Sequence, residues 1–162
     1  MLAELIDAAS KKCDDRLTVK AGFLTFGLPV QAELEKPSPQ ELSFLSTLRS
    51  QCRNVNTALL AELREAAINN WNLTIRCTIV SFLKEIKAIL PLSEIVTHGK
   101  DDSLSDFSRA LALIYLAEID KKEAKRIARQ IIKKAVPGNL SKELRYCAYR
   151  ILHPYLYPLF VK

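Results

Sequence analysis

The stretch SPQELSFLSTLRSQCRNVNTALLAELREAAINN, residues 38–70, decides the fold class. It opens with Ser38 as a capping residue, Pro39 at the first helical position and Glu41 in the capping-box position, which together mark a helix start. Apolar residues then recur at steps of three and four for about 25 residues, the period of one helix face. They are Leu42, Leu45, Leu48, Cys52, Val55, Leu59, Leu63 and Ala66. This spacing predicts one long amphipathic helix, which Asn69-Asn70 ends or bends.

Helical patterns continue on both sides of this stretch. Towards the N-terminus, apolar spacing predicts a helix over residues 2–13, whereas residues 17–30 have no helical period and predict a loop or a short extended segment. Towards the C-terminus, residues 75–90 predict a second long helix that Pro91 closes. Residues 92–102, with Gly99 and paired aspartates, predict a surface connection.

The last third of the chain also follows helical spacing. Residues 104–119 are apolar nearly all round, which predicts the central, buried helix of the protein. Asp120 then caps or interrupts the chain before a basic helix over residues 121–136. A final helix starts near Ser141 and runs towards Pro154.

Length and composition agree with a single helical domain. The chain has 162 residues, enough to bury a core without disulfides or metals, and only 4 glycines and 7 prolines argue against a turn-rich β architecture. No repeat of fixed period is present, so a helical solenoid fits only in a degenerate form. We therefore expect an all-α fold, a single compact bundle of five to six helices. Its regions are 1–37 (first helix and irregular segment), 38–120 (core helices) and 121–162 (basic C-terminal helices).

The cysteines and the N-terminus indicate the compartment. Cys13, Cys52, Cys77 and Cys147 form no C-x-x-C pair, which predicts reduced, mostly buried thiols. The first residues carry an acid at Glu4 and no basic or long apolar region, so we expect no signal peptide. No apolar run approaches the roughly 20 residues of a membrane span. A cytoplasmic protein without cofactor or metal is the expectation.

The charge of the chain is concentrated at one end. Residues 1–120 hold 13 basic and 16 acidic residues, a net of −3, whereas residues 121–162 hold 11 basic and 2 acidic residues, a net of +9. Such asymmetry is typical of a surface that binds a polyanion, and in the cytoplasm the commonest polyanion is nucleic acid.

The basic helix carries this charge in a pattern. An alanine and isoleucine stripe predicts a buried face, and Lys122, Lys125, Arg126, Arg129 and Lys133 form a second stripe of five cations. The nucleic-acid-binding candidates are Lys121, Lys122, Lys125, Arg126, Arg129, Lys133, Lys134, Arg145 and Arg150. The alternative is a solvated basic face that only keeps the protein soluble. Second-rank candidates on the long helices are Arg49, Arg53, Arg64 and Arg76.

Aromatic residues near the C-terminus leave two interpretations open. Tyrosines beside arginines can stack unpaired bases, but packing of the C-terminus against the protein, in the core or at an interface, is the preferred explanation. The residues concerned are Tyr146, Tyr149, Tyr155, Tyr157 and Phe160. For Trp71, core packing is favoured over an exposed anchor for a partner.

Little in the sequence supports catalysis. His98 with Asp101 and Asp102 resembles a metal or acid–base cluster only superficially and is assigned to a loop, and His153 is expected to be structural. The chain has no glycine-rich phosphate loop, no nucleophile elbow and no paired carboxylate motif. The sequence therefore predicts a protein that is not an enzyme.

With its helical pattern, its helix close to Met1 and the basic helix from Lys121 to Lys134, the chain resembles the small subunits of type I and type III CRISPR effector complexes. In some type I systems, including subtype I-D, this subunit is made from an internal start in the large-subunit gene, which the start Met1-Leu2-Ala3-Glu4 would fit. The resemblance implies antiviral defence, with several copies assembled alongside other subunits of a ribonucleoprotein. Their basic faces would hold single-stranded DNA or the guide RNA–DNA hybrid by its backbone, without reading sequence.

Two other functions compete with this interpretation. One is a helical protein–protein interaction adaptor whose basic helix meets an acidic partner. The other is a basic helix lying on an anionic membrane, which ranks last because its apolar face has no tryptophan or phenylalanine anchor. We expect no membrane partner.

Overall fold

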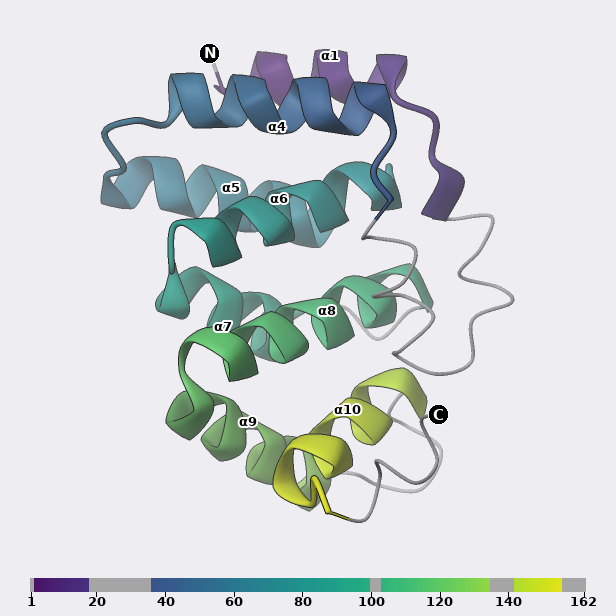
Figure 1. The fold of residues 1–162 in the computed structure, drawn as a ribbon, viewed down its shortest axis with the longest axis vertical. Helices are drawn as coiled ribbons and strands as arrows, with labels where there is room; N and C mark the ends of the chain where they lie inside the picture. Colours follow the sequence, from purple (N-terminus) through teal and green to yellow (C-terminus); the bar gives the residue numbers. More distant parts are fainter. Residues whose placement is uncertain (1, 18–35, 100–102, 135–141, 156–162) are drawn as a thin grey trace.

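The structure is a computed structural model that describes residues 2–17, 36–99, 103–134 and 142–155, and these ranges contain helices and no strand (Figure 1). The helices are α1 (Leu2–Lys12), α4 (Pro39–Gln51), α5 (Thr57–Asn69), α6 (Leu73–Glu85), α7 (Ile89–His98), α8 (Ser103–Ile119), α9 (Lys121–Lys133) and α10 (Lys142–Leu152). The all-α prediction is confirmed. The predicted count of five to six helices is wrong, because eight helices lie in the described residues alone. The irregular segment predicted within residues 1–37 lies mostly outside the described residues.

The described helices form two rows, with α1, α5, α7 and α9 in one and α4, α6, α8 and α10 in the other (Figure 1). Each helix packs against its neighbours in the same row and against helices of the other row. Helix pairs therefore stack along the longest axis, from α1 and α4 at one end to α9 and α10 at the other. α-Solenoids stack helix pairs in the same way, although this chain lacks a fixed sequence period. We call this arrangement the stack.

The core lies between the two rows, and its buried apolar residues form one continuous cluster. α8 is the central helix: it contacts α5, α6, α7, α9 and α10, and its Leu111, Leu113 and Leu116 are fully buried. The prediction of a buried central helix is confirmed. All four cysteines are buried and unpaired, as predicted. Burial raises the pKa of the Cys77 thiol in α6, which keeps this thiol protonated.

The long helix predicted over residues 42–66 is wrong, because the structure divides it into α4 and α5. The predicted start is confirmed: Ser38 and Glu41 form a complete capping box. α4 ends at Gln51, and Asn56 starts α5 by accepting a hydrogen bond from Leu59 N–H at 2.8 Å. The turn between the two helices allows α4 to pack on α6 while α5 packs on α7.

The predicted role of Pro91 is also wrong. α6 ends before it at Glu85, with Lys87 in the left-handed region (φ 54°) and the Ala88 N–H donating to Leu83 O at 2.9 Å, a Schellman motif. Pro91 lies in the first turn of α7, where a missing N–H removes no helical hydrogen bond.

The surface connection predicted over residues 92–102 is wrong as far as His98, because this part of the chain is helical. Leu92, Ile95 and Val96 of α7 are buried in the core. The helical spacing of these apolar residues was the signal in the sequence from which this helix could have been predicted. Residues 100–102 lie outside the described part of the chain.

A polar network joins the end of α1 to the start of α6. Asn72 is fully buried, and its side-chain amide donates to Ser10 O at 3.1 Å and Cys13 O at 2.9 Å. The Asn72 side-chain oxygen accepts from Ile75 N–H, which caps α6. The Asp15 carboxylate accepts from the first two N–H groups of α6, those of Leu73 and Thr74, so both Asn72 and Asp15 satisfy helix-end donors.

A nearly buried ion pair joins the segment after α1 to α4. Arg16 Nε lies 2.7 Å from Glu41 Oε2, and Arg16 Nη2 lies 2.8 Å from Glu41 Oε1. The Glu41 side chain is 4% exposed and the Arg16 side chain 21%. Burial by itself raises the pKa of Glu41, but hydrogen bonds from Arg16 and Ser38 outweigh this effect and hold the pKa below its ordinary value.

Ion pairs between exposed or partly buried side chains connect successive helices within each row. In one row, Arg49 of α4 pairs with Glu85 at the end of α6, and Lys84 of α6 pairs with Glu118 of α8. In the other row, Arg64 of α5 pairs with Glu94 of α7. Each pair is worth at most about 1 kcal/mol, so the apolar core holds the stack together.

We expect Gly99→Ala to lower the free energy of unfolding by about 1–3 kcal/mol, the usual cost of overpacking. A Cβ at this position would overlap Arg109 Cδ and lie 2.9 Å from the Ile95 carbonyl oxygen. Arg109 is buried and its Nε donates to Val96 O at 2.8 Å, so its side chain has little room to move. Urea denaturation measures the effect. If the clash is the cause, Gly99→Ala adds little to the loss already produced by Arg109→Ala, and simple additivity would contradict this explanation.

Candidate nucleic-acid interface

The local sequence explains where α9 begins and which side it buries. The Asp120 carboxylate accepts a hydrogen bond from Glu123 N–H at 3.1 Å and caps the helix, as predicted. The apolar stripe is buried against the stack; it consists of Ala124, Ile127, Ala128 and Ile131. α9 ends at Lys133 rather than at the predicted residue 136, and residues 135–141 lie outside the described residues.

Four cations lie on the side of α9 that points away from the stack. At about 100° per residue, Lys122, Arg126, Arg129 and Lys133 fall within an arc of about 60° that is opposite the buried stripe. All four are exposed. From Lys122 to Lys133 the arc runs about 17 Å along the helix, at 1.5 Å per residue. We call these four residues the cationic face.

The other three α9 candidates lie on the flanks of this face. Lys121 and Lys125 fall on one flank, and Lys134, the residue that caps the C-terminus of α9, falls on the other. Lys121 and Lys134 are exposed and Lys125 is half-buried. The helix therefore presents all seven predicted cations to solvent at least in part.

The positive charge of Arg126, one member of the cationic face, is already paired with a carboxylate. Arg126 Nε donates to Glu123 Oε2 at 2.9 Å, and a second guanidinium nitrogen bonds the other carboxylate oxygen. These hydrogen bonds hold the pKa of Glu123 below its ordinary value. Glu123 also accepts from Ser93 Oγ of α7 at 3.4 Å, so this flank of α9 is turned towards α7. Among the described residues, Lys122, Arg129 and Lys133 form no ion pair, and they are the stronger candidates.

Arg145 and Arg150 do not share a surface. They are five positions apart on α10, which places them about 140° apart around the helix. Arg150 lines a shallow groove of 320 Å³ with Ile114, Ala117 and Glu118 of α8. The buried side of α10 holds Leu144, Cys147 and Ala148. Arg145 lies on one flank of this buried side, and Arg150 lies on the other. At most one of the two arginines can extend the cationic face.

The second-rank arginines are largely engaged elsewhere. Arg49 and Arg64 form the ion pairs between helices described above. Arg76 is buried, and its guanidinium bonds Asn70 O and Ser105 Oγ. Arg53 is exposed in the turn between α4 and α5, at the opposite end of the stack from α9.

The aromatic residues of the C-terminal region are more exposed than packing would require. Tyr155 is 92% exposed and Tyr149 is 37% exposed, whereas Tyr146 is half-buried. Core packing is therefore wrong for Tyr155, and a place for it at an interface stays a prediction. Tyr157 and Phe160 lie outside the described residues.

Trp71 was expected in the core, and this expectation is wrong. It lies between α5 and α6 with 58% of its surface exposed. Its neighbours Asn70 and Asn72 cap the ends of these two helices, which leaves the intervening residue outside the core.

No group of side chains suited to metal binding occurs in the described part of the chain. His98 ends α7 and is exposed, His153 follows α10 and is exposed, and Asp101 and Asp102 lie outside the described residues. No helix among the described residues is long and apolar enough to cross a membrane.

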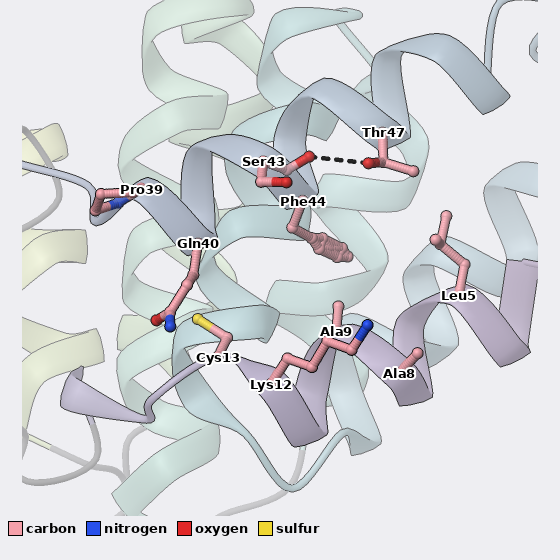
Figure 2. Close-up of a pocket in the computed structure, with 10 residues that line it drawn as sticks. All are labelled: Leu5, Ala8, Ala9, Lys12, Cys13, Pro39, Gln40, Ser43, Phe44 and Thr47. Carbon is pink, nitrogen blue, oxygen red and sulfur yellow. Dashed lines mark hydrogen bonds between the residues drawn. The ribbon is translucent and has the colours of Figure 1, made fainter.

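A further surface feature is a groove of 360 Å³ between α1 and α4 (Figure 2). Leu5 and Ala9 of α1 and Phe44 of α4 give it an apolar floor, and Lys12 is the only charged residue among the described residues that line it. Since no acid and base face each other there, the groove offers surface for contact and no acid–base pair for catalysis.

The fold and its surface define an all-helical stack with a cationic helix at one end. No family model, no curated protein and no solved structure matches the chain.

Proposed function

We propose that the chain is a non-catalytic protein that binds nucleic-acid backbone through α9, without reading sequence. The observation that carries this proposal is the cationic face, in which Lys122, Arg129 and Lys133 are exposed and form no ion pair among the described residues. Contacts from such side chains to phosphate oxygens supply affinity and position but carry no sequence information.

The energetics of α9 support an anionic partner. Like charges three or four residues apart on a helix repel each other by a few tenths of a kcal/mol per pair, and Glu123 is the only acid on this helix. A row of phosphates relieves this repulsion and releases its own condensed counterions. One DNA strand carries a charge every 3.4 Å of helix axis, so the face, about 17 Å long, matches roughly five phosphates.

The resemblance to CRISPR small subunits extends this proposal to a place in a larger ribonucleoprotein. There the chain would stabilise the guide–target hybrid or the displaced DNA strand next to other subunits. Co-purification of guide RNA and effector subunits with a tagged chain, from cells that carry such a system, tests this extension. Recovery of the chain without RNA would remove the extension and leave the backbone-binding proposal standing.

The direct test is the affinity of the wild type for a fluorescent oligonucleotide across a salt series. We expect the logarithm of the association constant to fall linearly with the logarithm of salt concentration, with a slope of about −0.7 for each phosphate contact on a single strand. Three to five contacts give a slope between about −2 and −3.5. Oligonucleotides of different sequence should give the same slope and affinity. Absence of binding at low salt would contradict the proposal.

The groove between α1 and α4 favours a second candidate, a helical adaptor for protein partners. This groove is apolar, and Leu42 is also exposed, on another side of α4. In this alternative α9 contacts an acidic protein surface, and the chain binds nucleic acid only weakly at physiological salt. The same salt series therefore separates the two candidates.

A further inference from the structure

The flank of α9 that carries Lys121 and Lys125 faces the open end of the stack. The opposite flank is turned to α7, because Glu123 on that side accepts a hydrogen bond from Ser93. α9 and α10 are the last helices of the two rows, and no further described helix covers them (Figure 1). Lys125 and its flank are therefore directed away from α7.

α10 exposes a matching flank at the same end. Arg150 lies in the groove with α8, so the opposite flank, with Arg145 and Tyr149, is directed away from α8. α9 and α10 pack directly on each other. The two open flanks consequently adjoin. Tyr155 follows the C-terminal end of α10, next to Pro154, which lines the edge of the groove with α8. We call the surface of Lys125, Arg129, Arg145, Tyr149 and Tyr155 the end surface.

The chemistry of the end surface differs from that of a bare cationic face. A tyrosine that is 92% exposed has most of its ring available to a flat partner, and Tyr149 adds a second partly exposed ring. Unpaired bases stack on such rings, and the interaction tolerates any sequence because every base has a π-face. In a duplex the bases are already stacked on one another and present only their edges in the grooves.

We infer that the end surface binds single-stranded nucleic acid, with phosphates held by the cations of α9 and Arg145 and unpaired bases stacked on Tyr149 and Tyr155. This inference rests on the proposed backbone binding and adds a substrate class to it. It also separates this surface from duplex-binding ones, which meet the bases only at their edges in the grooves.

The experiment compares three probes of equal length at one low salt concentration: a mixed-sequence single strand, an abasic strand with the same phosphates, and the duplex. The wild type should bind the base-containing strand at least about 30-fold more tightly than the abasic strand, the effect of two stacked bases at the lower end of the known range. Tyr149→Ala/Tyr155→Ala should remove this preference, while Tyr149→Phe/Tyr155→Phe should keep it because the rings remain.

Two different failures can be told apart. If base-containing and abasic strands bind equally well, with the salt dependence intact, the stacking inference is overturned and the backbone-binding proposal survives. Duplex binding as tight as single-strand binding would also overturn the stacking inference and leave the backbone-binding proposal standing. If no probe binds at low salt, the proposed function itself fails. Helical circular dichroism of all variants should match the wild type, because both tyrosines are at least partly exposed.

Discussion

Lys122→Glu/Arg129→Glu/Lys133→Glu should lose most of the affinity of the protein for nucleic acid. The three cations lie on one face of α9 without ion pairs among the described residues, so each is available for a phosphate. Removing three contacts should reduce the magnitude of the salt slope by about 2 on logarithmic axes, at about 0.7 per contact. Fluorescence anisotropy of a labelled single strand measures both quantities. Stability should change by no more than about 0.5 kcal/mol, because the residues are on the surface.

The matched control places the same charge change at the other end of the stack. Lys12→Glu/Lys36→Glu/Arg53→Glu also lowers the net charge by six units, at exposed positions next to α1 and α4. This variant should bind nearly as well as the wild type. Equal losses in the two triple variants would mean that net charge alone, and not the face on α9, attracts the nucleic acid.

Arg16→Met should destabilise the fold by about 3–5 kcal/mol at neutral pH, the range found when one member of a buried pair is removed. The substitution leaves the carboxylate of Glu41 only 4% exposed and without its bidentate partner. Methionine retains most of the apolar stem of arginine, so the loss reports mainly the uncompensated charge. Urea denaturation of the wild type and the variant measures the difference.

The difference in the free energy of unfolding between the wild type and Arg16→Met should also depend on pH. In the wild type the pKa of Glu41 is lowered, so the pair contributes stability above the unfolded pKa, about 4.3, and loses it as pH falls. In the variant the hydrogen bond from Ser38 N–H remains, but without Arg16 burial raises the pKa of Glu41 above its value in the wild type, so the penalty of the buried charge disappears on protonation. The gap between the two proteins should therefore narrow below about pH 4.

Glu41→Gln provides the internal control, because glutamine can still complete the capping box. Arg16→Met/Glu41→Gln should be more stable at pH 7 than Arg16→Met alone, since the buried charge is gone. No such recovery would indicate that the loss comes from other contacts of Arg16.

The helix starts that depend on local chemistry were predictable from the sequence. Ser38 and Asp120 cap helices as expected, and the apolar stripe of α9 left its cations on one face. The break at Asn56 was missed because apolar spacing continues through it, although asparagine is itself a capping signal. The end of α6 was missed because Lys87 occupies the left-handed position where glycine is usual.

The arrangement of the helices and the limits of the site depend on long-range packing. Nothing in the spacing of residues 38–70 shows that α4 and α5 belong to different rows. The spacing of Arg145 and Arg150 already separates them by about 140° around a helix, but only the structure shows that Arg150 is the one beside α8. Glu123, three residues before Arg126, was a local signal of the ion pair that reduces the value of Arg126 as a candidate.

The four buried cysteines give the molecule a set of internal chemical reporters. Only a thiolate exposed to solvent is alkylated, so a labelling reagent reaches each thiol only when the surrounding helices open. Cys13 and Cys52 adjoin the first helix pair, Cys77 lies in α6 of the second pair and Cys147 in α10 of the last. The labelling rate of each cysteine therefore reports the local opening of its own layer of the stack. A change in the labelling rate at one end on ligand binding at the other would show that the ligand reduces local opening there.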